Sequence, residues 1–112
     1  MNQRFVENLT DMPQVDDLAG LELSAPDSPV ELIENKAGSQ GSLRLYRYLM
    51  NKHGLINPAA AAEGLALYAE HTQDARLNPG KHPNIDRLLK IESGGLVCFV
   101  RLLPVGAHEK QP

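Results

Sequence analysis

The stretch Glu70-His-Thr-Gln-Asp-Ala-Arg-Leu-Asn-Pro-Gly-Lys-His-Pro-Asn-Ile-Asp-Arg87 joins two helical patterns across a tight turn. Asn78-Pro79-Gly80 has turn chemistry, because asparagine and glycine adopt turn backbone angles and proline fixes its own. A helix is predicted before the turn, from the cap and proline of Asn57-Pro58 to about Arg76. A second helix is predicted after it, beginning near Pro83 and ending before a pair of glycines.

Further elements surround this pair of helices. Apolar residues at helical spacing and at alternating spacing predict two helices and two strands. The helices cover residues 3–11 and 43–53, and the strands cover residues 18–23 and 30–35. The run from Leu96 to Val100 is apolar on both alternating faces, which is typical of a strand that is covered on both sides. We therefore place that strand at the centre of the sheet.

Residues 28–37 have a second interpretation. Ser28, Pro29 and Glu31 stand where a helix would have its cap, its first residue and its reciprocal capping glutamate. Gly38 could end such a helix. A strand is favoured because a helix of about nine residues is marginal unless it is well packed, and because residues 30–32 alternate between apolar and charged.

The predicted fold class is α+β. A small, mainly antiparallel three-stranded sheet is expected to pack against a layer of three helices, with a short N-terminal helix on the other face. The chain of 112 residues is long enough for one hydrophobic core. Residues 1–104 are therefore expected to form a single domain, and residues 105–112 a flexible tail of low apolar content.

Composition restricts the class of partner and the location. The net charge of −3 argues against a nucleic-acid partner, which would need a surplus of lysine and arginine. The sequence has no apolar segment of signal-peptide or membrane-spanning length, so a cytoplasmic location and no membrane contact are expected. The single cysteine, Cys98, lies in an apolar run, where a thiol is a poor nucleophile. These features argue against an enzyme.

The quoted stretch contains a candidate metal site. Imidazole and carboxylate groups are common ligands of divalent metals such as zinc. If the two helix ends lie side by side, four such groups could converge: His71, Asp74, His82 and Asp86. The same residues are also explained as ordinary helix-end and surface charges, because carboxylates are favourable near helix starts. The cofactor is thus unknown, with a divalent metal as one possibility.

The glycine-rich loop over residues 36–42 is a candidate anion site. A loop that leads into a helix presents free backbone N–H groups and the positive end of the helix dipole. The residues that could contact an anion there are Lys36, Ser39, Gly41, Ser42 and Arg44. The loop lacks the third glycine of dinucleotide-binding motifs and the lysine of P-loops, so its glycines also fit a simple tight connection.

Three segments resemble a family of small proteobacterial proteins classed as a domain of unknown function. They are Ile33-Glu-Asn-Lys-Ala-Gly-Ser-Gln-Gly-Ser-Leu43, residues 64–76 and residues 79–89. The resemblance covers nearly the whole chain after the first helix. It implies a bacterial, cytosolic, single-domain protein and assigns no catalytic or binding residue.

Two functional hypotheses follow. The first is a non-enzymatic interaction module whose partner is another protein or a second copy of the chain. It predicts an exposed apolar patch beside the helices, around Leu67. The second is a protein that binds a metal or a small anion, using the four metal-site residues and the glycine-rich loop. It predicts that His71, Asp74, His82 and Asp86 lie within a few Å of one another in a concave site.

Overall fold

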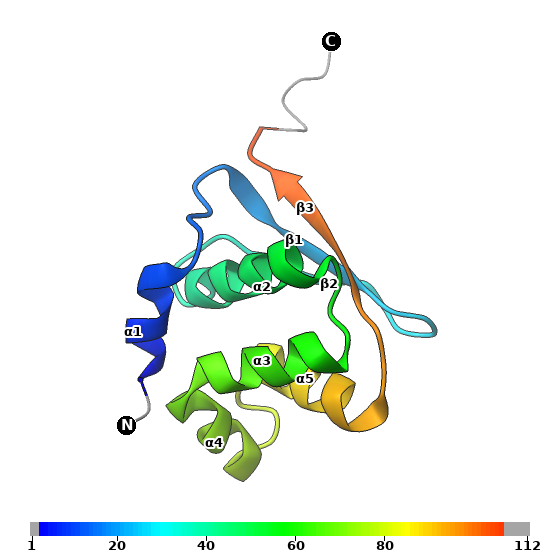
Figure 1. The fold of residues 1–112 in the computed structure, drawn as a ribbon. Coiled ribbons are helices and arrows are strands. Elements are labelled where there is room, and N and C mark those ends of the chain that lie inside the picture. Colours follow the sequence, from blue (N-terminus) through cyan, green and yellow to red (C-terminus); the bar gives the residue numbers. More distant parts are fainter. Residues whose placement is uncertain (1–2, 107–112) are drawn as a thin grey trace.

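A computed structural model describes residues 3–106. The elements in chain order are α1 (Phe5–Asn8), the 3-10 helix η1 (Leu9–Asp11), β1 (Leu18–Ser24), β2 (Glu31–Glu34), α2 (Gln40–His53), α3 (Pro58–Tyr68), α4 (Glu70–Leu77), α5 (Pro83–Gly94) and β3 (Phe99–Pro104). The α+β class is confirmed (Figure 1). The expected tail lies mostly outside the described residues, since residues 107–112 are not among them.

The sheet is antiparallel, with the strand order β2-β1-β3. Its central strand is β1, in which Leu21 and Leu23 are fully buried. The prediction that the run from Leu96 to Val100 forms the central strand is therefore wrong. The last strand begins at Phe99 and lies at the edge, and Leu96 and Phe99 are exposed. An apolar run is compatible with a buried strand, but long-range pairing decides which strand is central.

One face of the sheet packs on the helices, and the other is open. Residues 31–34 form a strand, as favoured, with Ile33 buried and Leu32 53% exposed. The expectation that the first helix covers this second face is wrong, because the ring of Phe5 in α1 stacks on Tyr68 of α3 with centroids 5.1 Å apart. Helix α1 thus lies on the helical side of the molecule (Figure 1).

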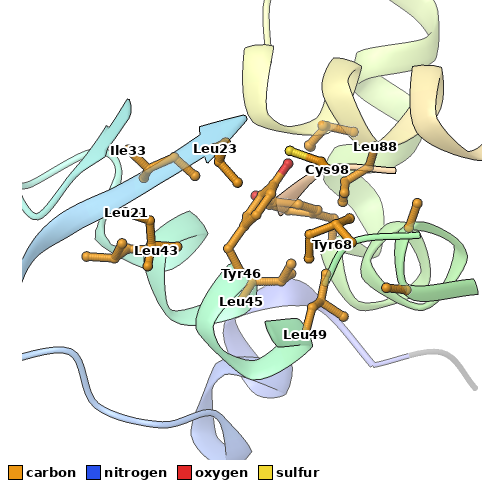
Figure 2. Close-up of a cluster of buried hydrophobic side chains, with 14 of the residues drawn as sticks. Leu21, Leu23, Ile33, Leu43, Leu45, Tyr46, Leu49, Tyr68, Leu88 and Cys98 are labelled. Carbon is orange, nitrogen blue, oxygen red and sulfur yellow. The ribbon is translucent and has the colours of Figure 1, made fainter. Parts of the chain in front are cut away.

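The core lies between the sheet and the helices. Helix α2 lies next to the sheet, and its Leu45, Tyr46 and Leu49 are fully buried (Figure 2). Helices α3 and α5 pack against each other, and α3 also contacts α2. The expected layer of three helices against the sheet is not confirmed. No helix among residues 3–106 is long and apolar enough to cross a membrane.

The helix predicted from Asn57-Pro58 to about Arg76 is broken at Ala69. Its start is confirmed, since the Asn57 side chain accepts a hydrogen bond from the N–H of Ala60 at 2.8 Å. At the break Ala69 has φ 57° and ψ −119°. Apolar periodicity does not report such a kink. The kink sets the direction of α4 and so the position of His71.

Replacing Ala69 with glycine is expected to stabilise the protein. A positive φ costs a non-glycine residue about 1–3 kcal/mol, and glycine removes that cost while adding up to ~1 kcal/mol of unfolded-state entropy. A net gain of about 1 kcal/mol would raise Tm by about 4 °C in a thermal melt. Ala66→Gly, at an exposed position inside α3, is the matched control and should lose about 1 kcal/mol. Equal losses in both variants would show that Ala69 is not strained.

Candidate functional site

A cavity of about 470 Å³ opens between the glycine-rich loop and the turn before α5, and we call it the loop–turn cavity. Its lining comes from α1, from the loop before α2 and the start of α2, from the end of α3 and the start of α4, and from the turn that leads into α5. The lining residues are Phe5, Ala37, Gly38, Gln40, Gly41, Ser42, Tyr68, His71, Lys81, His82, Pro83, Asn84 and Ile85. The two regions singled out in the sequence thus face one cavity. None of the described lining residues is acidic.

The start of α2 contributes unpaired backbone donors to this cavity. Gly38, with φ 92°, turns the chain just before the helix. Within the described residues, no backbone acceptor lies within hydrogen-bond distance of the N–H groups of Gln40, Gly41 and Ser42. The first turn of α2 has no acidic residue, and no side chain caps its start. The positive end of the helix dipole is therefore not neutralised locally.

The turn before α5 contributes the basic groups. Nε2 of His82 lies 2.6 Å from Oδ2 of Asp74, and Nζ of Lys81 lies 2.9 Å from the same oxygen. The hydrogen bonds from His82 and then from Lys81 lower the pKa of Asp74 to about 2. Asp74 is consequently ionised at neutral pH and holds both basic side chains in place.

His71 approaches the same group from α4. Its ring centroid lies 5.9 Å from that of His82 and 5.3 Å from that of Phe5, which it meets edge-on. Its Nε2 lies 3.7 Å from a carboxylate oxygen of Glu70. These contacts orient the imidazole toward Phe5 and His82 beside the cavity, and the His71 side chain is 43% exposed.

The predicted metal residues are only partly brought together. His71, Asp74 and His82 lie on one side of the turn, but Asp86 turns away, and its Oδ2 accepts the N–H of Gly80 at 2.9 Å. Within residues 3–106, no group of three or more His, Cys, Asp or Glu side chains could hold a metal ion. The metal site stays a prediction that this geometry does not support.

Two of the predicted anion-site residues line the cavity. The hydroxyl of Ser42 accepts a hydrogen bond from the phenol of Tyr68 at 2.7 Å. Gly41 lies under the ring of Phe5, where an added Cβ would be 3.1 Å from the ring edge. Glycine at this position therefore lets α1 pack closely on the start of α2.

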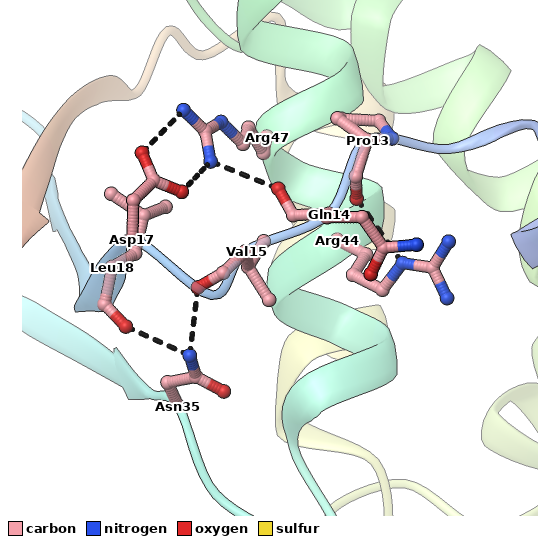
Figure 3. A network of polar contacts seen from close by, with 8 residues as sticks. All are labelled: Pro13, Gln14, Val15, Asp17, Leu18, Asn35, Arg44 and Arg47. Carbon is pink, nitrogen blue, oxygen red and sulfur yellow. Dashed lines mark hydrogen bonds and ion pairs between the residues drawn. The ribbon is translucent and has the colours of Figure 1, made fainter.

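The other three predicted anion-site residues lie outside the cavity lining. Nζ of Lys36 pairs with Glu34 at 3.0 Å, and the hydroxyl of Ser39 donates to the carbonyl of Glu34 at 2.6 Å. Arg44 donates three hydrogen bonds to backbone carbonyls of the chain segment that follows α1, and Figure 3 shows the one to Pro13. Arg44 therefore fixes the path between η1 and β1.

Sequence reasoning assigned no binding role to several residues of the cavity lining, among them Phe5, Tyr68 and Lys81. Lys81 had a usable signal, because it is a basic residue next to His82 in the turn between two helices. Phe5 and Tyr68 had none, since they reach the cavity only through the packing of α1 on α3.

Exposed large apolar side chains occur on the helices as well as on the sheet, and the two most exposed among the described residues are Leu77 of α4 and Val6 of α1. Leu67 is half-buried against the core. Val30, Leu32 and Phe99 are more than half exposed and belong to the hairpin and the sheet. Self-association and a protein partner both stay predictions.

Comparison with known proteins supports the resemblance noted in the sequence. No match was found among curated proteins or among solved structures. A family model described as an uncharacterised protein conserved in bacteria (DUF2322) matches residues 5–102. That match covers nearly the whole chain and both sides of the loop–turn cavity, so the protein belongs to this bacterial family.

Proposed function

We propose that the protein binds a small anion, of the phosphate monoester type, in the loop–turn cavity. The observation that carries this proposal is the composition of the lining. The start of α2, Lys81, His71 and His82 face one concavity whose described lining has no acidic side chain. Backbone donors at a helix start and a lysine ammonium are common phosphate ligands.

An anion fits the cavity better than a metal ion does. The Asp74 oxygen nearest to His82 already accepts Lys81, so a metal would have to displace an ammonium group. An anion needs no such displacement, because the ammonium has three donor protons and Asp74 uses one of them.

The size of the cavity indicates an organic phosphate. At ~30 Å³ for each water-sized group, 470 Å³ has room for roughly 16 non-hydrogen atoms. Free phosphate would fill only a part of it. The rings of Phe5, Tyr68 and His71 line the remainder, so an apolar or aromatic ligand body would contact ring surfaces.

Titration with phenyl phosphate, followed by amide NMR, tests the proposal. We expect saturable shifts at Gly41, Ser42 and Lys81. Lys81→Gln should weaken binding about tenfold, which corresponds to ~1.4 kcal/mol. Lys36→Gln is the matched control and should leave the affinity unchanged, because Lys36 pairs with Glu34 outside the lining.

Two results would contradict the proposal. One is an equal affinity in the wild type and in Lys81→Gln. The other is a pattern of shifts that avoids the start of α2. A parallel titration of chelator-treated protein with zinc distinguishes metal binding from anion binding. Zinc binding without phenyl phosphate binding would favour a metal at His71, Asp74 and His82.

A further inference from the structure

A second cavity, of about 280 Å³, lies between the β1–β2 turn, α5 and the segment before β3, and we call it the hairpin cavity. It does not share His71, Lys81 or His82 with the loop–turn cavity. Its apolar lining includes Leu23, Pro29, Ile91, Leu96, Val97 and the thiol side chain of Cys98. The hairpin cavity is therefore more apolar than the loop–turn cavity, although Glu31, Asp86, Arg87 and Lys90 also line it.

Arg87 forms a fixed part of this lining. Its side chain is 13% exposed, and its Nε donates to a carboxylate oxygen of Glu31 at 2.6 Å. Its Nη1 donates to the hydroxyl of Tyr46 at 2.9 Å and to the side-chain oxygen of Asn84 at 3.0 Å. Glu31 neutralises the guanidinium, so Arg87 anchors the hairpin to α5 and adds little free charge to the cavity.

Lys90 is the charged lining residue without a partner among the described residues. It is exposed at the rim, and no carboxylate of residues 3–106 lies within 4.0 Å of its ammonium. Asp86, the other charged residue on this side of α5, accepts the N–H of Gly80 at 2.9 Å. The lining therefore holds two carboxylates, Glu31 and Asp86, and two cations, Arg87 and Lys90, and the Lys90 ammonium is the cation that makes no ion pair within 4.0 Å among the described residues.

We propose that the hairpin cavity binds a monocarboxylate with a short apolar body. The carboxylate pairs with Lys90, and the body lies against Ile91, Leu96 and Cys98. At ~30 Å³ for each water-sized group, 280 Å³ has room for roughly nine non-hydrogen atoms, and hexanoate, with about eight, fits this volume. Burial of the apolar body provides affinity, and Lys90, the lining cation without an ion pair among the described residues, favours a ligand with one carboxylate.

Cys98 makes this site directly observable. It is the only cysteine of the chain, its side chain is 4% exposed, and burial raises the pKa of its thiol. A ligand in the hairpin cavity would cover this thiol and slow its alkylation by N-ethylmaleimide. At a hexanoate concentration ten times the Kd, we expect the alkylation rate to fall about tenfold.

Matched probes and variants complete the test, with methyl NMR of Ile91 and Leu96 as a second measure of binding. Hexan-1-ol and hexylamine have the same apolar body and should protect Cys98 much less than hexanoate does. Lys90→Gln should weaken hexanoate binding about tenfold. Lys81→Gln, at the loop–turn cavity, should leave the affinity for hexanoate unchanged. The test of the hairpin cavity is therefore independent of the proposed phosphate site.

Three outcomes would overturn the proposal. Hexan-1-ol protecting Cys98 as well as hexanoate would show an apolar hollow without a carboxylate site. An unchanged hexanoate affinity in Lys90→Gln would remove the role of the ammonium. If 10 mM hexanoate causes neither slower alkylation of Cys98 nor methyl shifts, the hairpin cavity does not bind such a ligand. A Kd of about 10 mM is taken here as the weakest useful affinity.

Discussion

Replacing Gly20 with alanine is expected to destabilise the protein by about 3 kcal/mol, because the new methyl group would collide with the neighbouring strand. Gly20 lies in β1 opposite Glu34 of β2. An added Cβ would lie 2.5 Å from the carbonyl oxygen of Ile33 and 3.3 Å from Cα of Glu34. Both obstacles are backbone atoms, so the conflict can be relieved only by moving one strand away from the other.

Urea unfolding of Gly20→Ala measures this cost. Ala19→Ser is the matched control, because residue 19 is exposed in the same strand, and its stability should change by less than ~0.5 kcal/mol. The displacement of β2 should also disturb the loop that follows it and weaken phenyl phosphate binding. A variant as stable as Ala19→Ser would show that the strands separate without cost at this point.

Local patterns were sufficient to predict most of the elements. The strands over residues 18–23 and 30–35 were predicted because alternation acts over a few neighbouring positions, and they pair as β1 and β2 in the expected antiparallel way. The start of α3 was predicted because Asn57 and Pro58 form a cap that depends on nearby backbone alone. These signals need no knowledge of distant contacts.

The errors concern features that depend on distant contacts. The run from Leu96 to Val100 was placed at the centre of the sheet, but β1 pairs with both other strands. The same run contains Cys98, which pairs with Ile56 in an isolated bridge and not with a strand of the sheet. Hydrophobicity reports burial, and it does not say which backbone is the neighbour.

At the candidate site too, features set by nearby residues could be predicted and features set by distant contacts could not. The glycine-rich loop and the turn before α5 could each be found from residue types, but their meeting around one cavity could not. It depends on α1, whose Phe5 packs on Tyr68 and covers Gly41. Arg44 was misjudged for a related reason, since its acceptors are backbone carbonyls that the sequence does not place near it.

The second large effect is expected where α3 crosses α2 and α5. Leu88 of α5 is fully buried, and Leu88→Ala should destabilise the protein by about 3 kcal/mol through lost burial and the cavity left behind. Gly64 of α3 faces this side chain, because an added Cβ would lie 2.8 Å from Cδ1 of Leu88 and 2.8 Å from Cδ1 of Leu49. The wild-type packing therefore requires a glycine there.

Gly64→Ala should consequently have opposite effects in the two backgrounds. In the wild type, crowding exceeds the ~1 kcal/mol that alanine gains in a helix, so we expect a loss of about 1 kcal/mol. In Leu88→Ala, the conflict with Leu88 is gone and the end of the Leu49 side chain can move into the vacated space, so we expect a gain of about 1 kcal/mol. The coupling of about 2 kcal/mol is measured by urea unfolding of the four proteins of the cycle.

A second cycle provides the control for this coupling. Leu18 is buried in β1 and is not among the atoms nearest to a Cβ at residue 64, so Gly64→Ala and Leu18→Ala should be additive within ~0.5 kcal/mol. Additivity in both cycles would mean that Gly64 and Leu88 do not share space. Coupling only in the first cycle would show that Gly64 and Leu88 share space where α3 packs against α5. Gly64 lies on α3, the helix that leads through Ala69 to His71.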